Sequence, residues 1–215
     1  MSMRRTITVK GSGQATVKPD CIRITLDLAA HDADYSNALE QATAQTDGLY
    51  EALRKAEFSP KTVHTTDFSI HPDVESFQVD GVWKQRTIGY CCTHRLVFEF
   101  PLDRERMICA LYALSTCDAL PECGIAFCLR DPRAAEELLL RDAAANAHER
   151  AEILANASGC ELGELLTIDY HVGKFDGISS TNFDTPHTLR MGKIPDLHPE
   201  ELRLQEDVTF TWELI

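Results

Sequence analysis

The chain has 215 residues, of which 44% are hydrophobic, so it can bury a core and is not a disordered segment. Its 21 Lys and Arg residues stand against 34 Asp and Glu residues, which gives a formal net charge of −13. Because this charge repels a phosphate backbone, nucleic acid is excluded as a partner. No apolar run approaches ~18 residues, so no membrane span is expected.

The N-terminal stretch MSMRRTITVKG contains two arginines but no apolar signal-peptide core and no small-residue cleavage site. We therefore expect a cytoplasmic protein. Its eight cysteines are expected to be reduced thiols, because disulfides rarely persist in the cytosol.

Residues 7–28 predict the start of a sheet. Ile7 and Val9 alternate with polar residues, and apolar side chains recur at every second position from 22 to 28. Between them, Gly11-Ser12-Gly13 easily adopts positive φ, which predicts a turn and hence a hairpin. A phosphate-binding loop explains these glycines less well, because such loops lead into a helix and here a strand follows.

Changes of hydrophobic period predict alternating helices and strands after residue 28. Strands 63–70 and 87–100 are expected to pair as a long hairpin across a polar connection. Asp131-Pro132 has the order of a helix cap and first turn, and Gly159 ends the long helix that follows. The inward stripe expected for that helix is Leu140, Ala144, Ala147, Ala151, Leu154 and Ser158. The other predicted elements are helices at 36–57 and 103–115 and strands at 123–129, 162–170 and 202–214.

The C-terminal part combines a loop with a regular strand. Residues 171–199 are rich in Gly, Ser, Asp and Pro and have no period, which predicts a long loop. Residues 202–214 alternate apolar and polar side chains. If this strand or the first one lies at a sheet edge, its unpaired backbone groups favour pairing with a neighbouring subunit. The candidate contact residues are Ile7, Val9, Leu202, Leu204, Phe210 and Trp212.

Cys91, Cys92 and His94 form the one tight Cys/His cluster of the sequence, and a soft metal ion uses such ligands. In a strand, neighbouring side chains point to opposite faces, so only Cys92 and His94 share one. Two ligands do not close a zinc site. We therefore expect no metal and no cofactor, with Cys92 and His94 as the alternative metal or thiol redox pair.

Two further groups have simpler structural interpretations. One group is His64, Asp67, His71 and Asp73, which could form an acid/base or metal site. The simpler interpretation is that these four residues lie on a polar, solvent-exposed face of a strand. The other group consists of three cysteines without CxxC spacing: Cys117, Cys123 and Cys128. We expect them to be small buried hydrophobic residues. The functional alternative is that one of them is an exposed thiol that senses oxidants. The sequence has no G-x-S-x-G, H-E-x-x-H or Walker-type motif, so no enzyme is expected.

The order of several segments resembles the SIMPL-domain family. ITVKGSGQATVKPD is similar to the family's N-terminal signature, and SNALEQATAQTDGLYEALRK to its first helix. TVHTTDFSIHPDVE and IGYCCTHRLVFEF resemble its next two strands. DPRAAEELLLRDAAANAHERAEILANASGCELGELLTID resembles its long alanine-rich helix, glycine stop and Leu-Gly strand, and DVTFTWEL resembles its last strand.

What this resemblance implies includes no catalytic activity and no catalytic residues. Relatives are typically exported, some form ring-like or channel-like homo-oligomers, bacterial members are linked to oxidative-stress tolerance, and a mammalian namesake interacts with a kinase. The chain departs from the family at Glu57-Phe58, where relatives commonly have Gly-Ile. The first helix therefore lacks the glycine of a left-handed cap, and must end differently or absorb strain.

Together these features predict one α+β domain over residues 1–215, with a mostly antiparallel sheet covered by two or three helices. Residues 1–100 and 101–215 are candidate layers. The expected function is non-enzymatic self-assembly into a homo-oligomer, linked to stress tolerance. The alternatives are a redox protein using Cys92 and His94, and a module that binds an unidentified protein partner through residues 171–199.

Overall fold

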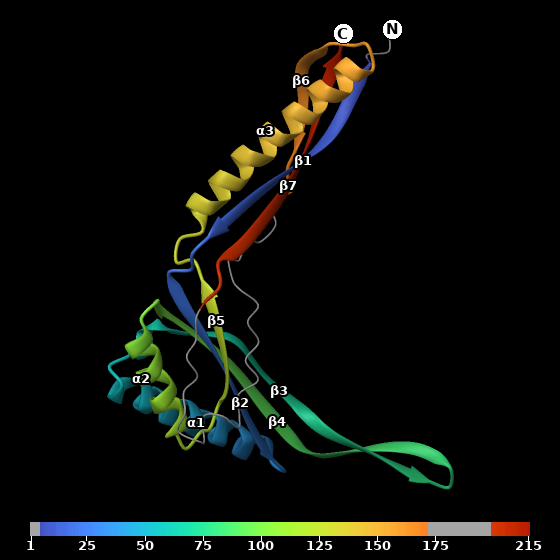
Figure 1. The fold of residues 1–215 in the computed structure, drawn as a ribbon. Helices are drawn as coiled ribbons and strands as arrows, with labels where there is room; N and C mark the ends of the chain where they lie inside the picture. Colours follow the sequence, from blue (N-terminus) through green and yellow to red (C-terminus); the bar gives the residue numbers. More distant parts are fainter. Residues whose placement is uncertain (1–4, 172–198) are drawn as a thin grey trace. The chain divides into compact units, whose positions relative to one another are not determined.

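The computed structural model describes residues 5–171 and 199–215 and consists of two antiparallel sheets with three α-helices (Figure 1). The predicted α+β class is confirmed. The described residues form two compact units that interleave along the chain: residues 5–20, 128–171 and 199–215 in the first, and 21–127 in the second. The predicted loop at 171–199 lies, apart from its end residues, outside the described residues.

The first unit is a three-stranded sheet with one helix packed on it. The strand order is β1 (Thr6–Val17), β7 (Leu202–Leu214), β6 (Leu162–Asp169), with both pairs antiparallel. Helix α3 (Arg133–Ala157) lies on β1 and β7. Its buried stripe is Ala135, Leu139, Ala143, Ala147, Ala151 and Ala155. Of the predicted stripe, only Ala147 and Ala151 belong to the buried set. Alanines occur around the whole helix, so the apolar pattern did not show which face packs on the sheet.

The predicted turn at Gly11-Ser12-Gly13 is wrong, because β1 runs through these residues without interruption. A Cβ on Gly11 would lie 2.0 Å from the carbonyl oxygen of Ala143, and one on Gly13 would lie 1.9 Å from that of Leu139. The two glycines thus allow the backbone of α3 to approach the strand closely. The predicted hairpin at 7–28 is wrong as well, because β1 pairs with β7 in the first sheet.

The second unit contains a four-stranded sheet in the order β3 (Val63–Val79), β4 (Val82–Pro101), β2 (Cys21–Asp32), β5 (Glu122–Cys128). The last residue of β5 belongs to the first unit. Helices α1 (Tyr35–Lys55) and α2 (Arg104–Ser115) enclose a core against one face, and the 3-10 turn η1 (Pro60–Thr62) precedes β3. The largest fully buried core side chains include Ile22, Ile24, Leu26, Leu96 and Phe98.

The predicted pairing of β3 with β4 is confirmed, but the hairpin is longer than expected. Residues 71–79 continue β3, and only Asp80 and Gly81, both with positive φ, separate the two strands. The polar composition of this segment had predicted an interrupted connection. Residues 74–79 instead form part of a two-stranded ribbon whose two faces are both exposed.

The C-terminus of α1 forms a left-handed cap without glycine. Glu57 has φ 63°, its N–H donates to the Arg54 carbonyl at 3.0 Å, and the Phe58 N–H donates to the Leu53 carbonyl at 2.9 Å. This is the Schellman pattern, in which glycine normally takes the left-handed position. The strain expected from the missing glycine is therefore present. Gly159, with φ 72°, takes the same position after α3.

Candidate functional site

Cys92 and His94, the alternative metal pair, lie on the helix-covered face of the second sheet. Cys92 is fully buried, and burial, followed by the charge of Cys91, raises the pKa of its thiol. A thiol of this kind stays protonated and reacts poorly. It is a core side chain that packs with Ala30 and Ala42.

His94 is a buried histidine with both ring nitrogens occupied. Its Nδ1 lies 3.0 Å from the Thr46 hydroxyl and its Nε2 lies 2.9 Å from the Thr65 hydroxyl. A hydroxyl can donate to one nitrogen and accept from the other, so a neutral imidazole is fully satisfied here. Burial lowers the pKa of His94, which keeps the ring neutral. No nitrogen remains for a metal ion, so His94 has a structural role.

Cys91 lies on the opposite, outer face of the same sheet, where it meets residues from two neighbouring strands. Its Sγ is 3.6 Å from Nε2 of His31 on β2, and Nδ1 of His31 donates to Oδ2 of Asp73 on β3 at 2.8 Å. These three side chains form one group with closely spaced ligand atoms. Sequence reasoning missed His31, because sixty residues separate it from Cys91 and only the strand register brings them together.

The four titratable residues predicted on one strand do not form one site. They lie on the outer face of β3, with His64 opposite Val97 at one end and Asp73 opposite Gly89 at the other. Seven residues of strand span about 23 Å, so His64 cannot act with His71. His71 and Asp73 are the members that lie beside Cys91.

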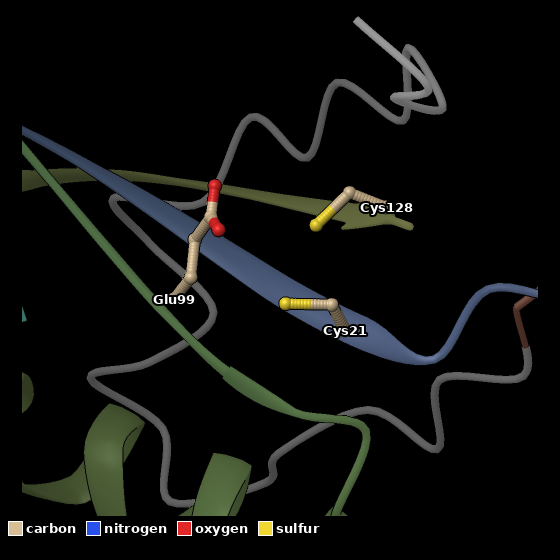
Figure 2. A group of neighbouring side chains, drawn as sticks. All are labelled: Cys21, Glu99 and Cys128. Carbon is tan, nitrogen blue, oxygen red and sulfur yellow. The ribbon is translucent and has the colours of Figure 1, made fainter. Parts of the chain in front are cut away.

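Figure 2 shows a second group of thiol and carboxylate side chains: Cys21 on β2, Glu99 on β4 and Cys128 at the end of β5. The Glu99 carboxylate accepts from Nε of Arg23 at 2.6 Å, so it already has a cationic partner. Cys128 belongs to the first unit and Cys21 to the second, so the group is not assigned to either unit as a site.

The cysteines predicted to be small hydrophobic residues occupy such positions. Cys117 and Cys128 are buried, and Cys123 packs against the core of the second unit. Burial raises the pKa of Cys123 to about 12. The Cys123 thiol therefore lacks the lowered pKa that an oxidant sensor requires. Cys109 on α2 is an exposed cysteine.

The predicted contact strands have little free backbone edge. Strand β7 lies between β1 and β6, so both of its edges are paired. The outer edge of β1 is covered by α3, because Asn146 accepts from the Ser12 N–H at 3.2 Å and Asp142 accepts from the Gln14 N–H at 2.9 Å. Side-chain groups that cover an edge in this way block strand addition. Among the predicted contact residues, Val9, Leu202, Phe210 and Trp212 are buried.

The β3–β4 hairpin instead projects beyond the rest of its sheet, and we call residues 74–88 the arm (Figure 1). The last β2–β4 pair is Asp32 with Tyr90, so within the described residues the arm has two strands, and neither of its long edges pairs with a third strand. Isolated two-stranded ribbons are marginally stable in water. Yet this one exposes large apolar side chains: Val74 48%, Val82 60%, Trp83 70% and Ile88 54%.

The two faces of the arm differ in charge. Directly opposed residues share a face, so the register places all the charged side chains of its two strands on one face, together with Phe77, Val82 and Ile88. On one face Arg86 donates to Glu75 at 2.8 Å and lies over the Phe77 ring, beside Lys84. The other, which we call the uncharged face of the arm, consists of Val74, Ser76, Gln78, Trp83, Gln85 and Thr87.

The described geometry defines a two-sheet α+β protein with an exposed β-arm. None of its described helices combines the length and apolar character that crossing a membrane requires. Residues 7–212 match the SIMPL family, described as a protein of unknown function (DUF541), and the chain belongs to this family. Comparison with curated proteins gives no match.

Proposed function

We propose that the protein acts by self-association, with the arm of one copy docking on a second copy, and that it has no catalytic role. The uncharged face of the arm carries this proposal. Trp83 is 70% exposed there. Tryptophan is among the residues most enriched in protein interfaces, so this side chain is a candidate contact residue. An exposed tryptophan on an uncharged face of a projecting element indicates a docking surface.

Charge favours a second copy of this chain as the occupant. The arm contains Glu75 and Asp80 against Lys84 and Arg86, so its net charge is zero, whereas the whole chain carries −13. Two copies therefore repel each other over most of their surface and meet with least electrostatic cost at their arms. The homo-oligomers implied by the family resemblance agree with this arrangement.

The backbone of the arm supports the same proposal. Toward the hairpin turn from Tyr90 on β4, and along the outer edge of β3, the backbone N–H and C=O groups have no neighbouring strand among residues 5–171 and 199–215. A strand from an identical arm satisfies them, and the same patch on both copies gives a closed two-fold contact. A closed two-fold contact gives an oligomer of defined size, whereas repeated strand addition at free edges leads to aggregation.

The experiment compares two neighbouring charge substitutions in the full chain. Trp83→Glu places a charge on the uncharged face, and we expect light scattering after size-exclusion chromatography to show loss of the oligomer. Lys84→Glu changes the charge on the opposite face of the same strand and should leave the mass unchanged. Monomeric wild-type protein at micromolar concentration, or equal disruption by both variants, would contradict the proposal.

Tryptophan quenching provides a second readout on the unmodified protein. Trp83 is 70% exposed, whereas Trp212 is 5% exposed, so acrylamide quenches the former preferentially. Self-association through the arm should protect Trp83, and quenching should rise as the protein is diluted. Quenching that does not depend on concentration, in samples whose mass changes, would place the contact elsewhere.

A further inference from the structure

On the outer face of the second sheet, at the base of the arm, the strand register sets two histidines opposite one cysteine. In the strand register, Cys91 on β4 lies opposite His31 on β2 and opposite His71 on β3. We propose that this face binds a divalent cation of the zinc class, with Cys91 and His31 as ligands and His71 as the third. A thiolate with imidazoles is a ligand set that zinc prefers in proteins.

The distance between the first two ligand atoms fits a shared ion. Zinc binds sulfur at about 2.3 Å and nitrogen at about 2.0–2.1 Å, so tetrahedral geometry places the two ligand atoms about 3.6 Å apart. The Cys91 Sγ and the His31 Nε2 are 3.6 Å apart. Binding therefore requires no movement of β2 against β4.

Asp73 orients His31 for this role. Its Oδ2 lies 2.8 Å from Nδ1 of His31, and an ionised carboxylate only accepts, so the proton of the neutral ring is on Nδ1. The Nε2 lone pair is then directed toward Cys91. A carboxylate behind a metal-binding imidazole fixes the tautomer and ring orientation in the same way. Asp73 is accordingly a positioning residue.

His71 supplies the third ligand from the other side of Cys91. Directly opposed side chains on paired strands have Cβ atoms about 4.5–5.5 Å apart, which is within reach of an imidazole ring. The His71 side chain is exposed, and binding requires its ring to turn toward the thiol. The three ligands come from the three strands that meet where the arm begins, so a bound cation joins β2, β3 and β4 at that point.

The same thiol, imidazole and carboxylate could be interpreted as a nucleophilic triad, but the surroundings favour a cation. A nucleophilic cysteine requires surroundings that stabilise its thiolate, whereas the group around Cys91 includes the Asp73 carboxylate. Strand β4 is paired on both sides, so ladder bonds occupy the N–H groups that an oxyanion hole would need. A cation provides the positive charge that stabilises the thiolate, and the thiol proton leaves to solvent.

The test uses the reduced, chelator-treated full chain and titrates it with zinc against a chromophoric chelator, and with cobalt(II) as a spectroscopic probe. We expect one cation per chain at this site, with thiolate-to-cobalt charge-transfer absorption. Cys91→Ser should abolish that absorption, and His31→Gln and His71→Gln should each weaken zinc binding. Asp73→Asn should weaken binding about 10- to 100-fold, as loss of such a hydrogen-bond partner does elsewhere.

Two matched controls distinguish this site from adventitious binding. Cys109→Ser removes an exposed thiol on α2, and His64→Gln removes an exposed imidazole on the same strand as His71. Both should bind cobalt and zinc as the wild type does. Wild type without a charge-transfer band, or the same band and affinity in Cys91→Ser, would overturn the proposal. Unchanged zinc binding in His71→Gln would overturn the third ligand.

The cation site and the self-association proposal are tested separately. Trp83→Glu changes the uncharged face of the arm but none of the three ligands, so it should bind zinc as tightly as the wild type. Loss of zinc binding together with the oligomer would show that the cation is held between copies. That outcome would overturn a site made by one chain.

Discussion

Replacing Glu57 by glycine should stabilise the protein, because this residue holds a left-handed conformation that disfavours a side chain. Its φ is 63°, and its side chain is exposed, so removal of the side chain affects no core packing. A residue with a Cβ costs about 1–2 kcal/mol in this region. Glycine loses about 0.5–1 kcal/mol more conformational entropy on folding. The difference predicts a gain of about 0.5–1 kcal/mol.

Chemical denaturation followed by far-ultraviolet circular dichroism measures this gain as a higher midpoint at unchanged slope. In thermal unfolding, about 1 kcal/mol corresponds to about 2–4 °C in a chain of this size. Glu57→Ala is the matched control, because it removes the carboxylate and keeps the Cβ. Its stability should stay within about 0.5 kcal/mol of the wild type, as for other surface substitutions.

The reverse substitution can be made in the same chain. Gly159 has φ 72°, and the Cys160 N–H donates to the Ala155 carbonyl in the same cap arrangement. A Cβ at Gly159 meets no atom within 4 Å, so Gly159→Ala tests backbone conformation alone. It should lower the free energy of unfolding by about 1 kcal/mol. If Glu57→Gly is no more stable than Glu57→Ala, the conformational argument is refuted.

Four further variants test packing and titration. Gly13→Ala forces α3 away from β1 and should lower the free energy of unfolding by about 3 kcal/mol. Gly48→Ala places a methyl group in open space on α1 and should raise the free energy of unfolding by about 1 kcal/mol. Ile24→Asp with Leu26→Asp should leave no folded material by circular dichroism, because both side chains are fully buried. The pKa of His94 is lower in the folded chain, so stability should fall as pH drops below about 6.5, and His94→Gln should weaken that dependence. A soluble folded double variant, equal effects of the two alanines, or an unchanged pH slope would each contradict the corresponding argument.

The elements that depend on neighbours along the chain could be predicted. The 3.6-residue and 2-residue periods identified the three helices and the strand cores, and the burial of Ile24 and Leu26 followed from their alternation. The missing glycine at position 57 predicted strain that the positive φ of Glu57 confirms. The extent of the hairpin was underestimated, because a ribbon exposed on both faces lacks the apolar alternation that marks a half-buried strand.

Long-range pairing was decided by the tertiary structure alone. Gly11 and Gly13 are compatible with a turn and with a flat strand surface, and only the approach of α3 distinguishes the two. His31 contributes to a site only because the register sets it opposite Cys91, and a shift by one residue would turn its side chain to the other face. Sequence patterns therefore determined which segments form helices and strands and which side chains are apolar. The partners of each strand, and with them the arm and the group of Cys91, His31 and Asp73, were determined by contacts between residues far apart in the chain.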